Sequence, residues 1–383
     1  MYSRKSPPSI CCPVCAEKCN PFLSVGRQAL PCRANFFYSI TDVPAAKTKS
    51  STVNPMKPLR SRLSAAGVKP KFLNKVVLPS WWEDSIAATP GGLREAAGYI
   101  CAHLGYSLNS LLDEKQSLTF AHTGAVKYKK AKGVTDDDVS LATHYALGVA
   151  RAVAAAMVEV PAAAAVPSPE EWRKALLALS DKPWVCLRHI LKAAWELGIP
   201  VIHLKTLPEG AKKPDALTTM VGERPVIVVL NARKSPSWIA FIVAHELGHI
   251  HHKHLKPGQT LVDEKIDKTS DETDEGQAND FASLLLTGHS DLGLNSTRSM
   301  GIPQLATAAA SFGKSYRIAP GVAALNYGFT TGEWPLAIGA LSQLEKNDDA
   351  AVDLKQAMTE YLDMDALSED TREWITRATT TVE

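Results

Sequence analysis

The sequence has no apolar run long enough to cross a membrane. Its most apolar stretch, "ALGVARAVAAAMVEVPAAAAVP" at 146–167, is rich in alanine and interrupted by Arg151, Glu159 and Pro161, whereas a spanning helix needs about 20 strongly apolar residues. The N-terminus, "MYSRKSPPSICCPVCAEKC", also lacks the apolar segment of a secretory signal. We therefore expect a cytoplasmic protein with reduced thiols and no membrane contact.

Cysteine is scarce after residue 32, where only Cys101 and Cys186 remain. The other five form an N-terminal cluster: Cys11, Cys12, Cys15, Cys19 and Cys32. Four of these thiols are enough for a structural zinc site. The surroundings, rich in Pro, Ser and Lys, instead favour a disordered leader, or a misannotated start with Met56 as the natural first residue.

The whole chain has no large excess of either charge, since its net charge is +2. The two parts of the chain nevertheless differ. Residues 1–133 carry 19 Lys and Arg against 7 Asp and Glu, a net charge of +12, so the remainder carries about −10. A basic first third is compatible with DNA binding, or with docking onto the acidic part of the same chain.

Residues 71–114 predict a small helical region. Thr89 and Pro90 indicate a helix start, Gly105 indicates its end, and "YSLNSLL" predicts a second short helix. The stretch "HLGYSLNSLLD" resembles the helix-turn-helix domains of Xre-like repressors. Because the second helix carries no Lys or Arg, we favour protein contact over DNA binding for it. The lysine-rich "KYKKAKGV" (127–134) is interpreted as a solvated linker or a phosphate-binding patch.

The pattern that follows is mainly helical, with β-rich runs at "IPVIHL" (199–204) and "RPVIVVL" (224–230). We therefore predict an α+β fold in which a small mixed sheet lies beside helices. The stretch "IAPGVAALNYGF" is predicted to be broken by Pro and Gly. The expected domains are a leader or misannotated start (1–56), a helix-turn-helix-like domain (57–133), a long helix with a Pro/Ala linker (134–169), a metal-binding core (170–290) and a helical C-terminal region (291–383).

The stretch "PSWIAFIVAHELGHIHH" (236–252) carries the strongest functional signal. Ser235 and Pro236 predict a helix start, and His245 and His249 then project from one helical face. Two imidazoles at this spacing bind one zinc ion, and Glu246 lies where it can take a proton from water. Apolar neighbours such as Ile242 and Leu247 indicate a buried helix, in which polar side chains need partners.

A catalytic zinc site uses three protein ligands, so the third is expected downstream. Glu275 begins the predicted helix "EGQANDFASLLL", where a packed helix holds its carboxylate rigidly. Asp271, Glu272 and Asp274 in the acidic loop before it are alternative ligands. His289, Tyr316 and Tyr327 are candidate oxyanion donors.

Helical spacing also sorts the remaining histidines. His252 lies near the face of His249 and is a candidate for an outer contact, whereas His251 and His254 are predicted to cap a solvated helix end.

The two segments "SPSWIAFIVAHELGHIHHKH" and "EGQANDFASLLL", with the strand-like "PVIVVL" before them, resemble the ImmA/IrrE family of zinc metallopeptidases. The similarity covers about residues 195–290. It implies a zincin-like core, one zinc ion per chain on His245, His249 and Glu275, and Glu246 as catalytic base. One departure is that the family often follows its LL with Met-Pro, whereas this chain has "LLLTGHS".

Members of this family commonly cleave or control Xre-type repressors, so the resemblance implies an endopeptidase with such a protein substrate, in stress response or mobile-element regulation. The alternative is a DNA-binding or protein-binding regulator whose zinc site serves sensing or structure. A toxin–antitoxin component is a further alternative.

Overall fold

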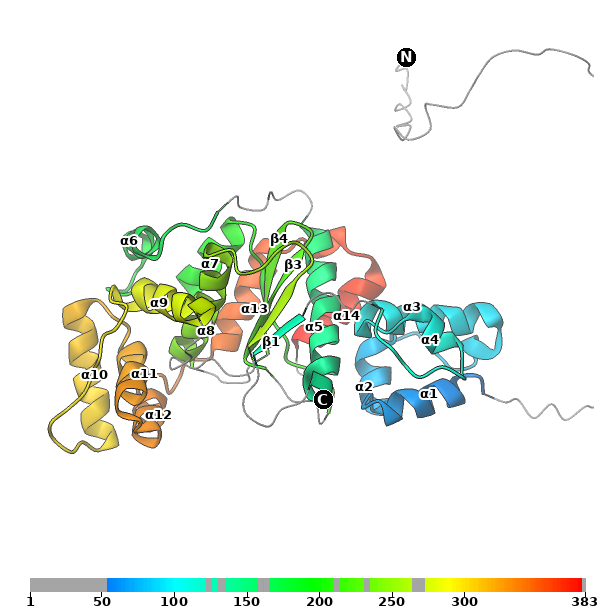
Figure 1. The fold of residues 1–383 in the computed structure, drawn as a ribbon, viewed down its shortest axis with the longest axis horizontal. Helices are drawn as coiled ribbons and strands as arrows, with labels where there is room; N and C mark the ends of the chain where they lie inside the picture. The colour runs from blue at the N-terminus through cyan, green and yellow to red at the C-terminus, as the bar shows by residue number, and fades with distance from the viewer. Residues whose placement is uncertain are drawn as a thin grey trace, which may run out of the picture. The chain divides into compact units, whose positions relative to one another are not determined.

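The computed structural model describes residues 54–121, 126–129, 136–157, 161, 165–209, 214–230, 235–263 and 273–380. All of them belong to one compact unit, residues 52–383 (Figure 1). Its helices are α1 (Met56–Ala65), α2 (Pro70–Phe72), the π-helix η2 (Leu73–Val77), the 3-10 helix η3 (Ile86–Ala88), α3 (Pro90–Leu104), α4 (Leu108–Leu112), α5 (Asp136–Ala156), α6 (Pro169–Leu179), α7 (Leu187–Glu196), α8 (Pro236–His251), α9 (Thr273–Thr287), α10 (Ile302–Tyr316), α11 (Pro320–Thr331), α12 (Trp334–Leu344), α13 (Ala350–Tyr361), the 3-10 helix η4 (Met364–Ala366) and α14 (Glu369–Thr379). Among these described helices, none is long and apolar enough to cross a membrane.

A mixed five-stranded sheet lies at the centre, in the order β1-β5-β3-β4-β2. Strand β3 pairs antiparallel with β4 and β5, whereas the outer pairs β1–β5 and β2–β4 are parallel. Gly222, at a φ of 62°, makes the tight turn of the β3–β4 hairpin. The strands are β1 (Val126–Lys129), β2 (Val201–His203), β3 (Ala216–Val221), β4 (Arg224–Val229) and β5 (Thr260–Asp263).

Two of the five strands, β2 and β4, lie where the β-rich runs predict them. The interpretation of the lysine-rich stretch as a linker is wrong for residues 127–129, which belong to strand β1 and pair with residues 261–263. That pairing joins segments more than 130 residues apart, so no local pattern announces it. Strand β3 was also missed, because its two central threonines interrupt the apolar run that marks a buried strand.

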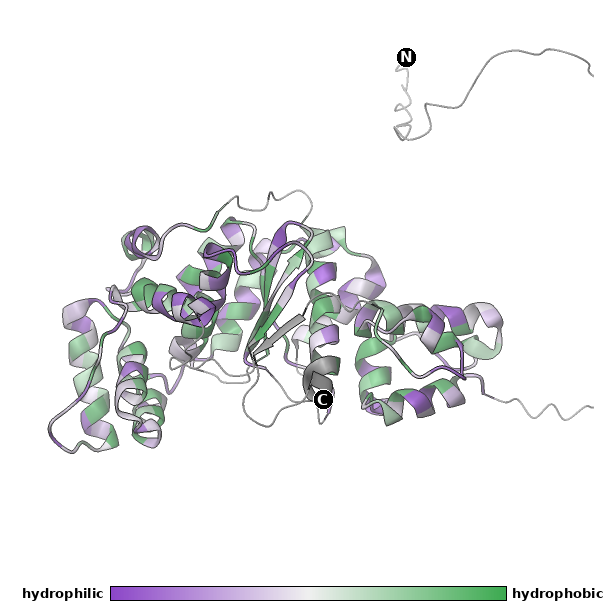
Figure 2. Cartoon of the chain, in the orientation of Figure 1, coloured by the Kyte–Doolittle hydropathy of each residue, from purple (hydrophilic) through white to green (hydrophobic). Residues whose placement is uncertain are grey.

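The central strands are covered on both faces. Helix α8 packs on β3 and β4 from one side and α5 packs on them from the other (Figure 1). Accordingly β3 and β4 are mainly apolar, as Figure 2 shows, and Val226 to Val229 are fully buried. Burial on both faces gives a continuous apolar strand instead of an alternating one.

The C-terminal region is mainly helical from Ile302 onward, as the sequence predicts, but residues 291–301 form no helix. One expectation there is wrong: "IAPGVAALNYGF" is not broken, because Pro320 occupies the first turn of α11 and the helix runs on to Thr331. Its glycines serve close packing. A Cβ at Gly328 would lie 2.7 Å from the Cβ of Ala337 on α12.

The N-terminal helices pack on the last helix, α14. The His103 ring stacks on Trp374 with centroids 3.9 Å apart, Tyr99 donates a 2.5 Å hydrogen bond to Asp370, and Arg377 donates to the carbonyl of Leu78. A helix, a turn at Gly105 and the five-residue α4 do follow one another here.

Candidate metal centre

Helix α8 begins where the sequence predicts. The Ser235 hydroxyl accepts a hydrogen bond from the Trp238 N–H, and Pro236 occupies the first turn. A second cap comes from the C-terminal region, because the half-buried Glu345 carboxylate accepts hydrogen bonds from the hydroxyls of Ser235 and Ser237. A carboxylate at a helix N-terminus is favourable for the helix dipole. These contacts tie the start of α8 to the end of α12.

The three predicted ligands lie together between α8 and α9. His245 Nε2 is 3.0 Å from His249 Nε2 and 3.4 Å from Glu275 Oε2, and His249 Nε2 is 3.0 Å from Glu275 Oε1. Ligand atoms at about 2.0–2.1 Å from a tetrahedral zinc are about 3.3–3.4 Å apart. Nitrogen and oxygen donors that converge at these separations fit a zinc ion.

All three groups are buried, with 0% exposure for the histidine side chains and 5% for Glu275. Burial by itself would raise the pKa of Glu275, but the adjacent His245 and His249 side chains hold that pKa well below its ordinary value. The carboxylate is therefore ionised, as a ligand must be.

Close packing of the two helices brings the ligands into reach. A Cβ at Gly248 would lie 2.8 Å from the Cα of Ala278 on α9. Because no larger residue fits at this crossing, the glycine of "HELGH" sets the separation between α8 and α9.

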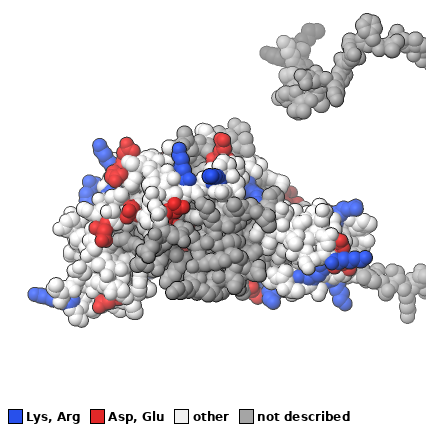
Figure 3. Space-filling view, viewed as in Figure 1, with Lys and Arg blue, Asp and Glu red and all other residues white. Residues whose placement is uncertain are grey.

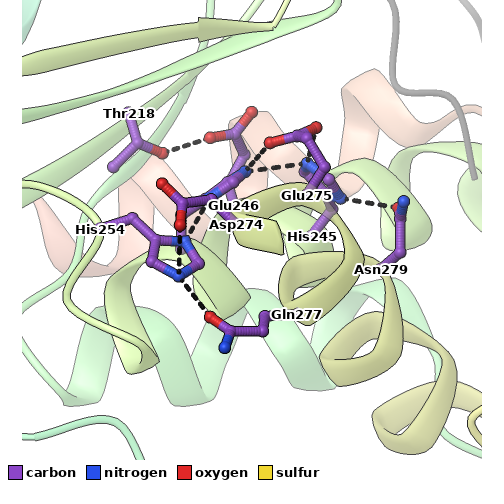
Figure 4. A network of polar contacts seen from close by, with 9 residues as sticks. Thr218, His245, Glu246, His254, Asp274, Glu275, Gln277 and Asn279 are labelled. Carbon is purple, nitrogen blue, oxygen red and sulfur yellow. Dashed lines mark hydrogen bonds and ion pairs between the residues drawn. The ribbon is translucent and has the colours of Figure 1, made fainter. Parts of the chain in front are cut away.

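Asn279 orients the first histidine ligand. Its side-chain oxygen lies 3.0 Å from His245 Nδ1 (Figure 4). An amide oxygen only accepts hydrogen bonds, so Nδ1 carries the proton and the lone pair of Nε2 is available to a metal. Asn279 follows Glu275 by four residues on α9, so ligand and orienting residue share one helical face.

His254 orients the second ligand in the same way. Its Nε2 lies 2.8 Å from Gln277 Oε1 (Figure 4). Its Nδ1 lies 2.8 Å from His249 Nδ1. The Gln277 oxygen accepts a hydrogen bond from His254 Nε2, so the unprotonated Nδ1 of His254 accepts a hydrogen bond from His249 Nδ1. This leaves the lone pair of His249 Nε2 for a metal.

The interpretation of His254 as a cap of a solvated helix end is therefore wrong. The side chain of His254 is 6% exposed and contacts a ligand instead of capping a solvated end. His252, the predicted outer contact, is exposed, and its ring stacks on that of His254 with centroids 5.5 Å apart. His251 lies 2.9 Å from the Val166 carbonyl through its Nδ1, which must be the donor.

Glu246, the predicted base, is fully buried beside the metal ligands. The Thr218 hydroxyl on β3 donates a 2.5 Å hydrogen bond to its Oε2 (Figure 4). This contact holds the carboxylate in one orientation. Nothing in the local sequence of β3 indicates the role of Thr218, since the contact joins positions 28 residues apart.

The alternative residues lie elsewhere. Asp271 and Glu272, like the five N-terminal cysteines, fall outside the described residues. Asp274 is 3.8 Å from His254 Nε2 and is not in the metal group.

Each of the three candidate oxyanion donors either bonds to another residue or is exposed to solvent. Tyr327 donates its hydroxyl to Glu333, and Tyr316 is 59% exposed and stacks on Phe312. His289 is exposed.

An HExxH helix with a carboxylate on the following helix is an arrangement that zinc metallopeptidases use to hold their metal. Residues 194–319, about a third of the 383-residue chain, match the family model Peptidase_M78, described as the IrrE N-terminal-like domain. The matched region contains α8 and α9, and so all four predicted site residues. This match supports the ImmA/IrrE resemblance and a peptidase. No curated protein matches the chain.

Proposed function

We propose that this protein is a zinc-dependent endopeptidase of the ImmA/IrrE kind, which hydrolyses a peptide bond in a protein substrate. The observation that carries the proposal is the convergence of His245, His249 and Glu275 beside the buried Glu246. A purely structural zinc site has no need of a base at this position.

When bound, the zinc ion supplies a Lewis acid that makes water nucleophilic near neutral pH and polarises the scissile carbonyl. Glu246 takes a proton from the attacking water while the water oxygen adds to the carbonyl carbon of the substrate. The same carboxyl then protonates the leaving amine while the C–N bond breaks. Thr218 holds Glu246 in position through both transfers, and His254 and Asn279 keep the two imidazoles oriented.

The proposed substrate is an Xre-like transcriptional repressor, in a stress-response or mobile-element setting. The support is the family resemblance together with the match over residues 194–319. In this proposal the N-terminal helices contribute protein contacts.

The experiment is co-expression of the chain with an Xre-like repressor encoded beside its gene, followed by mass spectrometry of the repressor. Wild type is expected to produce two fragments, whereas Glu246→Gln is expected to bind one equivalent of zinc and to produce none. Cleavage by the Glu246→Gln variant would overturn the role of Glu246. If the repressor stays intact in the strain with the wild-type enzyme, that repressor is not the substrate.

A second candidate function is DNA binding, and the observation that favours it is the net charge of +12 over residues 1–133. Several of these charges are already engaged. Arg60 pairs with Asp84, and Arg62 donates to three backbone carbonyls at and after the end of α4. Over α1–α4, the face drawn in Figure 3 carries acidic side chains among the basic ones.

An electrophoretic shift series tests this second function. Specific phosphate contacts would make the affinity fall steeply between low and physiological salt. If no mobility shift is seen even at low salt, DNA binding by the folded chain is excluded.

A further inference from the structure

A cysteine and a histidine contact each other at the start of α7, outside the metal centre. Cys186 directly precedes the helix, and its Sγ lies 2.8 Å from Nδ1 of His189. The thiol makes no capping hydrogen bond to the helix backbone. On the other side of the ring, His189 Nε2 lies 3.9 Å from a carboxylate oxygen of Asp181. A thiol, an imidazole and a carboxylate therefore follow one another in a row.

The protonation states of this pair suit a base-assisted nucleophile. Burial raises the pKa of the Cys186 thiol, although the charge of Arg188 opposes this. Burial also lowers the pKa of His189, and Arg188 lowers it further. The thiol therefore donates its S–H to a neutral imidazole, which can take the proton when the sulfur attacks. The charge of Asp181 beside Nε2 stabilises the imidazolium that results.

The third member of the row is held too loosely for a hydrolytic triad. The Asp181 side chain is 63% exposed and pairs with Arg188. Its distance of 3.9 Å from His189 Nε2 is longer than a hydrogen bond. In a triad the carboxylate fixes the orientation of the imidazole through repeated turnovers. The arrangement at Cys186 is better suited to a thiol that reacts once and keeps its adduct.

Cys186 lines a cavity of about 520 Å³, within the range of ligand pockets. Three helices begin at this cavity, because the first residues of α7, α8 and α11 line it: Leu187, Pro236 and Pro320. The N-terminus of a helix carries partial positive charge, which favours an anion such as a thiolate. The cavity therefore supports the charged form of the sulfur at the moment of attack.

Side chains of both charges line the same cavity. The cations are Lys182 and Arg188, and the carboxylates are Glu345, Asp348, Asp349 and Asp353. A small molecule with ammonium and carboxylate groups would find a partner of opposite sign for each of them. An uncharged molecule would make neither kind of pair. The lining thus fits a zwitterionic ligand of the amino-acid or short-peptide type.

We propose that Cys186 is a modification site that undergoes thiol–disulfide exchange with small disulfides of amino acids or short peptides. His189 takes the proton from Cys186 Sγ while the sulfur attacks one sulfur of the disulfide. The new S–S bond forms as the old one breaks, and the leaving thiolate takes the proton from His189. The products are a mixed disulfide on Cys186 and one free small thiol. The adduct would lie beside Pro236 and Ser237, at the start of the metal-binding helix α8.

The test incubates the full zinc-loaded chain with glutathione disulfide, which is zwitterionic, or with the uncharged bis(2-hydroxyethyl) disulfide. Mass spectrometry of peptides after acid quenching gives the rate at each cysteine. Cys101, the other half-buried cysteine in the described part of the chain, is the internal reference. Cys186 is expected to react with glutathione disulfide at least about 10-fold faster than Cys101. Its preference for the zwitterionic over the uncharged disulfide should also exceed that of Cys101.

Two variants test the base. His189→Gln is expected to slow the exchange at Cys186 by about 10-fold or more. Lys192→Gln, on the same helix but outside the cavity, should leave it unchanged. The rate at Cys101 in each variant reports whether the fold is retained.

Three results would count against the proposal. Equal rates at Cys186 and Cys101 in the wild-type chain would overturn the modification site. A rate at Cys186 that His189→Gln leaves unchanged would overturn the role of His189 as base. The same preference between the two disulfides at both cysteines would overturn the zwitterionic class of ligand. None of these readouts depends on peptidase activity.

Discussion

His254 Nδ1 lies 2.8 Å from Nδ1 of the metal ligand His249, although His254 is no longer part of α8. The helix ends at His251, and Lys253 adopts a left-handed conformation with φ 57°. The His254 N–H donates to the His249 carbonyl and the Lys253 N–H to the Ile250 carbonyl, the pair of bonds that defines a Schellman motif. The motif turns the chain back, so that His254 meets the last turn of the helix.

His254→Ala is expected to weaken zinc binding, because it removes the acceptor that keeps the proton on Nδ1 of His249. The loss should be about 10- to 100-fold in affinity, measured by competition with a chromogenic chelator. His289→Ala is the matched control, since that side chain is exposed and outside the metal group. Equal affinities in the two variants would contradict the orienting role. Partial recovery in His254→Asn, which restores an acceptor, would support it.

Glu275→Gln is expected to lower zinc affinity by more than about 100-fold, above the range for outer partners. The substitution keeps the shape of the side chain and removes its charge. Asp274→Asn, one residue earlier and outside the metal group, should stay close to wild type. The measurement is the zinc content of the two variants after dialysis against a chelator. A larger loss of zinc in Asp274→Asn than in Glu275→Gln would make Asp274 the ligand.

Thr218→Val is expected to slow cleavage about tenfold, because an unmet hydrogen bond to a buried carboxylate costs about 1–3 kcal/mol. Thr219→Val provides the control. Adjacent strand residues face opposite sides of the sheet, and Thr219 contacts Thr260 instead of the site. Turnover of a peptide library randomised around the cleaved bond measures both variants. Similar rates for the two would show that Thr218 does not position Glu246.

Gly248→Ala is expected to destabilise the fold by about 1–3 kcal/mol, because the added methyl group meets the backbone of α9. Gly276→Ala on α9 meets nothing within 4 Å. It should be neutral or stabilising by up to about 1 kcal/mol through helix propensity. Urea unfolding of both variants checks the sign. A neutral Gly248→Ala would mean that the helices do not approach this closely.

Acidification is expected to weaken the contact between the N-terminal helices and α14. Burial lowers the pKa of His103 to about 4, although its hydrogen bond to Val77 and the charge of Asp370 partly oppose this. The unfolded chain binds this proton near pH 6.5 and the folded protein only near pH 4. The contribution of the neutral His103 to the free energy of unfolding is thus fully present above about pH 6.5. It falls by about 3 kcal/mol as the pH is lowered towards 4.

The measurement is the free energy of unfolding of wild type and His103→Gln at pH 7 and pH 4.5. The variant should be less stable at pH 7 but should lose less stability on acidification. Equal losses in the two proteins would exclude His103 as a source of the pH dependence.

The sequence alone predicted the elements whose signals are local. The start of α8 follows from Ser235 and Pro236, which act within one turn, and the shared face of His245 and His249 follows from helical periodicity. Placement of Glu275 on a packed helix needed only the pattern of the next segment. The strands β2 and β4 were visible because burial on both faces makes them continuously apolar.

Tertiary structure decided what depends on distant contacts. Thr218 reaches Glu246 through a strand that the sequence pattern did not reveal, and β1 pairs with a segment more than 130 residues away. His254 was misplaced because helical spacing was extended past the point where Lys253 reverses the chain. A periodic pattern determines which residues share a face only while the backbone repeats. Where the backbone turns, or where two segments meet across the fold, packing decides which side chains meet.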